Sequence, residues 1–284
     1  MPLPASDIAA AAQLACRLEV TAPKPGNVSP GRPFRDLRFE DFLASADAIG
    51  PAMLRAGDRP VGSIVFEAVQ ASMRAAHTNT NLGMVLLLAP LARAAGLCEP
   101  GQSLRDALAA VLDATTVADA RDVYRAIRMA GPGGLGTAPE QDVADDPTEP
   151  LIEVMRLGAS RDDVAREYAT AFATTFETGM PTLRELRQRG ISWDDAIVQT
   201  YLTILAARPD THIARRAGRP LAADVSARAA RVLERGGVAT DAWRAAVNEL
   251  DDSLRDPGNT ANPGTTADLV TASISALLVS PPNG

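Results

Sequence analysis

The residue types best suited to catalysis and phosphate binding gather in three short segments that interrupt a helical pattern. The first is Pro23-Lys24-Pro25-Gly26-Asn27, where prolines stiffen the backbone and a glycine allows close approach of a ligand. Lys24 is the single lysine among 28 basic residues, so we expect it to bind phosphate in a tight loop where arginine would not fit. The alternative is a rigid surface turn with a solvated lysine.

The second segment, Asn79-Thr80-Asn81-Leu82-Gly83, precedes a strongly apolar stretch. An Asn or Thr at this point caps a helix, and the free amides of the first turn attract anions. A triphosphate could lie against Asn81, with Gly83 leaving room for it. The alternative is an ordinary helix cap without a ligand.

The third segment, Asn262-Pro263-Gly264-Thr265-Thr266-Ala267-Asp268, repeats this design at the last predicted helix. Thr265 or Thr266 is the expected cap, and Asp268 either serves the site or complements the helix dipole. Most of the seven asparagines lie in or beside the three segments, namely Asn27, Asn79, Asn81, Asn259 and Asn262.

Two acids and a histidine complete the candidate set. Glu67 is a lone acid in an apolar helical stretch, so a buried carboxylate there needs a metal, a cation or a catalytic task. Asp210 and His212 follow a helix break, and His212 could protonate a leaving group near neutral pH. The alternative for His212 is a structural role.

Helical periodicity must position these segments. Apolar residues recur at intervals of three and four over residues 8–18, 39–54, 64–73 and 82–95, while alternating strand patterns are scarce. Thr116, Ser160 and Ser192 are predicted caps of further helices. We therefore predict an all-α fold of roughly a dozen helices in one domain over residues 1–284. Residues 131–150 are predicted to form a long loop, either functional or a flexible surface excursion.

Composition excludes several classes of function. A formal net charge of -7 gives no attraction to nucleic acid or an anionic membrane surface. The longest apolar stretch, Met84 to Leu91, is too short to span a bilayer, and no signal peptide is recognisable, so we expect a cytoplasmic protein. Cys16 and Cys98 have neither paired spacing nor nearby histidines, which argues against a disulfide or zinc. Small molecules are the expected partners, and a homo-oligomer stays open.

In this order the segments resemble one family, the triphosphoribosyl-dephospho-coenzyme A synthases. The similarity spans residues 19 to 270. The matching pieces are Pro23 to Asn27, Asp41 to Ala46, Gly62 with Glu67, Asn79-Thr80 with Gly83, Asp210-Thr211 with Arg216 and Gly218, and Asn262 to Leu269.

The resemblance implies an all-helical enzyme that joins the ribose of ATP to a hydroxyl of dephospho-coenzyme A, expels adenine and keeps the triphosphate, with Mg²⁺ as cofactor. It implies catalytic roles for Glu67, Asp41 and His212, and metal binding by Glu67, Asp210 and Asp268. The implied nucleotide-binding residues are Lys24, Gly26, Asn27, Asn79, Thr80, Asn81, Gly83, Asn262, Gly264, Thr265 and Thr266.

Two departures affect the acceptor. Well-known members of the family carry a histidine where this chain has Phe39, and His-Lys where it has Asn81-Leu82. The variant pattern resembles a branch associated with archaea and methylotrophs, which suggests an acceptor in one-carbon cofactor synthesis of the methanopterin or methanofuran kind. The rival interpretations are another Mg²⁺-dependent nucleotide-using enzyme and a non-catalytic nucleotide-binding protein.

Overall fold

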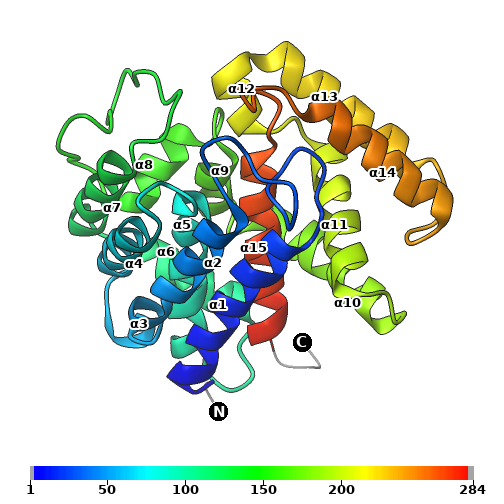
Figure 1. Cartoon of the computed structure of the whole chain (residues 1–284). Helices are drawn as coiled ribbons and strands as arrows, with labels where there is room; N and C mark the ends of the chain where they lie inside the picture. The colour runs from blue at the N-terminus through cyan, green and yellow to red at the C-terminus, as the bar shows by residue number, and fades with distance from the viewer. Residues whose placement is uncertain (1–2, 281–284) are drawn as a thin grey trace.

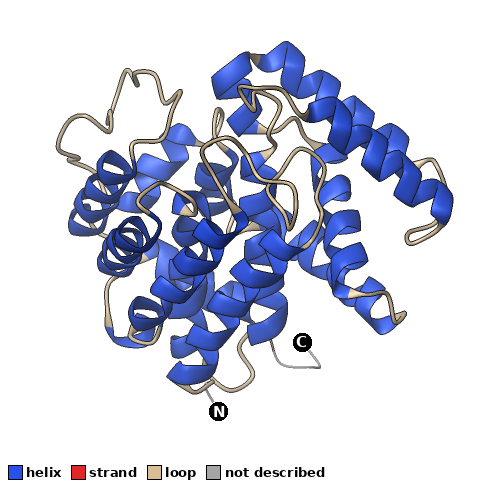
Figure 2. Cartoon of the chain, in the orientation of Figure 1, coloured by secondary structure: helices blue, strands red, loops and turns tan. Residues whose placement is uncertain are grey.

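A computed structural model describes residues 3–280, and all regular elements within them are helical (Figure 2). An isolated β-bridge joins Ser29 and Arg32. The predicted all-α class is therefore confirmed. The elements are α1 Ala5–Thr21, α2 Phe39–Ala48, α3 Gly50–Met53, η1 Ala56–Asp58, α4 Val61–Ala76, α5 Leu82–Leu97, α6 Leu104–Asp113, α7 Val117–Ala130, α8 Leu151–Gly158, α9 Asp163–Ala169, η2 Thr175–Gly179, α10 Met180–Gln188, α11 Trp193–Ala207, α12 Thr211–Ala217, α13 Arg219–Leu233, α14 Asp241–Leu254 and α15 Gly264–Val279.

Helix α15 runs through the middle of the molecule (Figure 1). It packs against α1 and α5 on one side and against α10, α11 and η2 on the other. Nearly every side chain of α15 is buried, including hydroxyls. Two of these hydroxyls are satisfied inside the helix, since Thr271 and Ser273 donate to the carbonyls of Ala267 and Leu269.

Small residues allow α15 to be enclosed. A Cβ added at Gly179 of η2 would lie 1.9 Å from Ser273 Oγ, so η2 sits directly on the helix. Close packing of this kind buries the middle of α15 between its neighbours. Its first turn, beginning at Gly264, meets the long loops and the first turns of α5 and α12.

Local predictions fare unevenly. The predicted helix over residues 39–54 is divided into α2 and α3 at Gly50-Pro51, because proline lacks the amide that would continue the first helix. Thr116 caps α7 as predicted, with Asp119 completing the capping box. Ser160 was the wrong cap for α9, whose N-cap is Asp162. Within residues 3–280, no helix combines the length and apolar character needed to cross a bilayer.

Candidate active site

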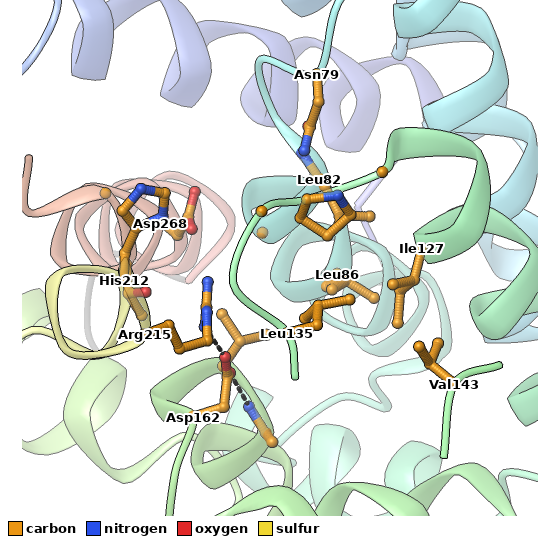
Figure 3. A pocket seen from close by; sticks show the side chains of 18 of the residues that line it. Asn79, Leu82, Leu86, Ile127, Leu135, Val143, Asp162, His212, Arg215 and Asp268 are labelled. Atoms are coloured by element: carbon orange, nitrogen blue, oxygen red, sulfur yellow. Dashed lines mark hydrogen bonds and ion pairs between the residues drawn. The ribbon is translucent and has the colours of Figure 1, made fainter. Parts of the chain in front are cut away.

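A cavity of about 560 Å³ opens among the first turns of α5, α12 and α15, the start of α9 and the loop after α7 (Figure 3). Two of the three predicted segments, beginning at Asn79 and Asn262, form parts of its wall directly, while the first contributes Asn27. Residues from nearly the whole length of the chain thus surround one space. Its volume is in the usual range for a small-molecule site.

Asp268 places a carboxylate in the wall of this cavity. Its oxygens lie against the backbone of Gly83, because a Cβ at Gly83 would be only 2.0 Å from Asp268 Oδ2. Burial, followed by the negative charges of Glu19, Asp210 and Asp162, raises the pKa of Asp268 well above its ordinary range. The first turns of α5 and α15 therefore meet at an acid with unusual proton affinity.

A buried carboxylate, Asp210, joins α12 to α15. Its Oδ1 accepts the amide of Ile213 at 3.0 Å and so caps α12. Its Oδ2 accepts both the amide and the hydroxyl of Thr266, each at 2.7 Å. Thr211 adds a second link by donating to Thr265 Oγ1 at 3.3 Å. These bonds fix the first turn of α15 relative to α12.

His212 follows this buried acid and faces the cavity beside Asp268 (Figure 3). Burial first, and then the charges of Arg215 and Arg216, lower the pKa of His212 to about 4. Its Nε2 is buried and lacks a hydrogen-bond partner within the described residues. At neutral pH the ring is therefore uncharged and can offer a hydrogen bond to a ligand, but it does not hold the extra proton that the predicted acid role requires.

Arg215, one turn further along α12, directs a guanidinium to the same end of the cavity. One of its terminal nitrogens forms an ion pair with Asp162, the N-cap of α9. Its Nε is buried without a partner within residues 3–280. A guanidinium held on one edge by a carboxylate is oriented to bind an anion with its remaining donors.

The asparagines complete the polar wall. Asn27 donates through Nδ2 to Asn262 Oδ1 at 3.1 Å, which connects the proline-rich loop to the start of α15. Asn79 accepts the amide of Leu82 at 3.2 Å and so helps to cap α5. Asn81 is buried and donates to Ser72 of α4 at 3.1 Å. The amide side chains mainly hold the loops, and their remaining polar atoms line the cavity.

Comparison with known sequences places these features in a family. The sequence profile of the CitG family, described as ATP:dephospho-CoA triphosphoribosyl transferase, matches residues 5–283. The chain belongs to this family. The transferase class predicted from the sequence is thereby confirmed, and ATP is a substrate of the family.

Relatives of the ATP:dephospho-CoA triphosphoribosyl transferase family are distant in sequence. A Vibrio cholerae protein named "Probable 2-(5''-triphosphoribosyl)-3'-dephosphocoenzyme-A synthase" is 26% identical over 281 residues, covering 91% of this chain and 83% of its own. A Pseudomonas putida protein of the same name is 38% identical over 109 residues, 38% of each chain. A crystal structure named for a triphosphoribosyl-dephospho-CoA synthase of Archaeoglobus fulgidus has a TM-score of 0.66 at 29% identity, covering 84% of this chain and 98% of that one.

Lys24 does not line the cavity of this transferase. Both Lys24 and Glu19 of α1 are 0% exposed, and their charged groups lie 3.0 Å apart. The ammonium also donates to the carbonyls of Glu19 and Ala22, which caps the end of α1. The ammonium of Lys24 is directed to Glu19 and Ala22 and not to the cavity, so the structure gives no support to the expected contact with phosphate.

Two predicted catalytic acids also lie outside the cavity. Glu67 is an ion-pair partner of Arg55 and Arg59 on the outer part of α4, with 28% of its side chain exposed. Asp41 accepts the amide of Arg38 at 2.8 Å and belongs to the cap of α2. Glu67 is bound by local cations and Asp41 by a local amide, and the structure does not bring either acid to the cavity.

Three other predicted residues lie behind the wall. Gly26 donates its amide to Asp251 at 2.8 Å, and Asp210 and Thr266 bind each other. The predicted metal set of Glu67, Asp210 and Asp268 does not converge, and residues 3–280 hold no group of three or more His, Cys, Asp or Glu arranged for a metal. The predicted residues that do line the cavity are Asn27, Asn79, Thr80, Asn81, Gly83, His212, Asn262, Gly264, Thr265 and Asp268.

Sequence reasoning missed Arg215 and Asp162. Arg215 stands in the segment that drew attention to His212, but arginine is abundant in this chain and nothing in the pattern distinguishes one from another. Asp162 was passed over because Ser160, two residues earlier, also fits a capping pattern. Recognising Asp162 as the cap would have placed an acid at the start of α9, where it can meet a cation.

Replacing Lys24 with methionine tests the buried ion pair. Lys24→Met leaves Glu19 charged and unpaired, so the free energy of unfolding should fall by about 3–5 kcal/mol. Urea denaturation is the measurement. The double variant Lys24→Met with Glu19→Met should recover most of this loss; equal destabilisation of the single and double variants would contradict the ion pair.

Replacing Gly83 with alanine tests the contact with Asp268. The new methyl group must displace the carboxylate, so kcat/KM should fall by about 10²-fold or more, as expected when a reacting group moves by an ångström. Stability should change little, since alanine favours helix. Gly57→Ala is the control, because its Cβ would meet only an atom at 3.9 Å outside the cavity. Full activity of Gly83→Ala would remove Asp268 from the reaction.

Proposed function

We propose that this chain transfers the 5-triphosphoribosyl group of ATP to a hydroxyl of dephospho-coenzyme A, with release of adenine, in the cavity at the first turn of α15. Family membership and one observation support this. Asp268, His212 and Arg215 converge with the asparagine-bearing segments around a single cavity. A single catalytic domain in the cytoplasm is part of the proposal.

The triphosphate fits the end of the cavity at Arg215. The guanidinium, held by Asp162, has a buried Nε without a partner. Helices α5 and α15 are 16 residues long, and the N-terminus of each lies at this cavity. The free backbone amides of these N-termini favour negative charge. Arg215 therefore takes the role that the sequence suggested for Lys24.

The chain's own residues do not fit a resident Mg²⁺ site, since Asp268 alone of the predicted metal set lines the cavity. We propose that Mg²⁺ enters as the complex with ATP, held by phosphate oxygens, and that it neutralises part of their charge.

In the reaction, a bond forms between the acceptor oxygen and C1′ of the ribose, while the bond between C1′ and N9 of adenine breaks. Asp268 accepts the proton of the acceptor hydroxyl and faces the positive charge that develops on the ribose. Its raised pKa makes it a stronger base than an ordinary aspartate. Asp268 returns its proton to solvent, and the departing adenine takes up one proton from solvent, so the step balances. Neutral His212 offers a hydrogen bond to the bound substrate.

Chromatography of free adenine tests the function. The protein is incubated with ATP, Mg²⁺ and dephospho-coenzyme A, and with methanopterin precursors as other acceptors. Adenine formed in proportion to a triphosphoribosylated product is expected. Formation of ADP or phosphate without adenine would instead favour a hydrolase or ligase, and binding without turnover would favour a nucleotide sensor.

The pH dependence of kcat/KM tests Asp268. A carboxyl with a raised pKa is protonated below that pKa and acts as a base only above it, so activity should rise with pH through an apparent pKa above the ordinary value of about 3.9. Asp268→Asn should lose about 10²–10⁴-fold in kcat/KM. It should also unfold at an equal or higher temperature, because it removes a carboxyl whose ionisation burial disfavours. The control is Asp224→Asn, whose side chain is exposed on α13. If kcat/KM of Asp268→Asn still falls at low pH as it does in the unaltered protein, the assignment is refuted.

A further inference from the structure

Half of the cavity is lined by apolar side chains for which the proposed chemistry has no use. They come from α5, α7 and the loop of residues 131–150, and Ile127 and Val143 lie across the cavity from Asp268 and His212 (Figure 3). We define this apolar compartment by Leu82, Leu86, Ile127, Leu135 and Val143. A wall of this kind gains free energy by covering an uncharged, apolar part of a ligand.

Polar groups beside the apolar compartment already bind one another. The hydroxyl of Tyr124 donates to the carbonyl of Gln141. The side-chain oxygen of Gln141 accepts the amide of Thr148 at 3.0 Å, and Asp142 accepts the amide of Ala144 at 2.8 Å. These groups hold the loop in shape by binding one another, and Arg161 is the cation that lines the cavity near Tyr124 and Asp142.

The opposite end of the cavity has the reverse character. The two buried cavity-wall atoms without a partner within the described residues, His212 Nε2 and Arg215 Nε, both belong to it. A ligand with one anionic end and one flat, uncharged end therefore has a single favourable orientation. Its anion lies near Arg215, and its uncharged end enters the apolar compartment.

We infer that the apolar compartment holds the adenine base of ATP, and that Leu135 and Val143 are specificity-determining contacts for this base. The inference rests on the proposed function. The base and the triphosphate of ATP are joined through one ribose, so a triphosphate at Arg215 directs the base to the compartment. The acceptor dephospho-coenzyme A also carries an adenine base joined through a ribose to phosphates, so the test has to compare the two molecules.

The loop that carries Leu135 spans the cavity. It leaves α7 at Gly131 and reaches α12, where a Cβ at Gly134 would lie 3.1 Å from the carbonyl oxygen of Arg215. Gly134 and Gly136, on either side of Leu135, both have positive φ. Since glycine adopts this conformation without strain, the chain can turn twice and set Leu135 against the cavity.

Calorimetric binding of adenine, ATP and tripolyphosphate to Leu135→Ser and Val143→Ser tests the inference without requiring turnover, and dephospho-coenzyme A is titrated beside them. Adenine and ATP should bind about tenfold more weakly to each variant, whereas tripolyphosphate should bind as it does to the unaltered protein. Leu54→Ser is the matched control, since Leu54 is 48% exposed outside the cavity and Leu135 is 39% exposed. It should leave binding of all three unchanged.

Three outcomes would overturn the inference. If adenine binding is undetectable, or is unaltered in both variants, the apolar compartment does not bind the base. Equal weakening of tripolyphosphate would show collapse of the whole cavity. Weaker binding of dephospho-coenzyme A with unaltered ATP binding would assign the compartment to the acceptor. Failure of the unaltered protein to release adenine from ATP would refute the proposed function. The comparison of ATP with dephospho-coenzyme A in the two variants would still decide the occupant, because both molecules carry an adenine base.

Discussion

The buried carboxylate of Asp210 is the constraint on which the polar end of the site depends. It is 1% exposed, and it accepts hydrogen bonds from the first turns of both α12 and α15. Helix α12 has only 7 residues and would have little stability alone. Since α12 carries His212 and Arg215 and α15 carries Asp268, one acid determines how these three side chains face each other.

Negative charge is concentrated beneath the cavity. Glu19, Asp162 and Asp210 all raise the pKa of Asp268, and two of these acids are paired with cations, Glu19 with Lys24 and Asp162 with Arg215. Lys24 thus neutralises a buried acid while it fixes the loop that carries Asn27. Because each of the two cations is paired with another acid, the proton affinity of Asp268 depends on how α1, α9, α12 and α15 are packed together.

The fold class was predictable because three- and four-residue periodicity persists along most of the chain. The meeting of Asn27, Asn262 and the Asn79 segment was also foreseeable, since these rare residues break the helical rhythm. Lys24 shows the limit. Its scarcity predicted a special environment correctly, but its partner Glu19 sits in an ordinary helical pattern, and no local rule distinguishes an ion pair from a phosphate contact. The partners of Glu67 could not be foreseen either. Arg55 and Arg59 lie before α4, and helical periodicity does not show that they fold back onto Glu67.

The central place of α15 has a consequence for biogenesis. This helix follows in chain order all the helices that surround it, so during synthesis α1, α5 and α11 must emerge before the element that fills the space between them. Their apolar faces stay exposed in the meantime, and long-range closure is slow. The cavity can form only after α15, which supplies part of its wall, has left the ribosome.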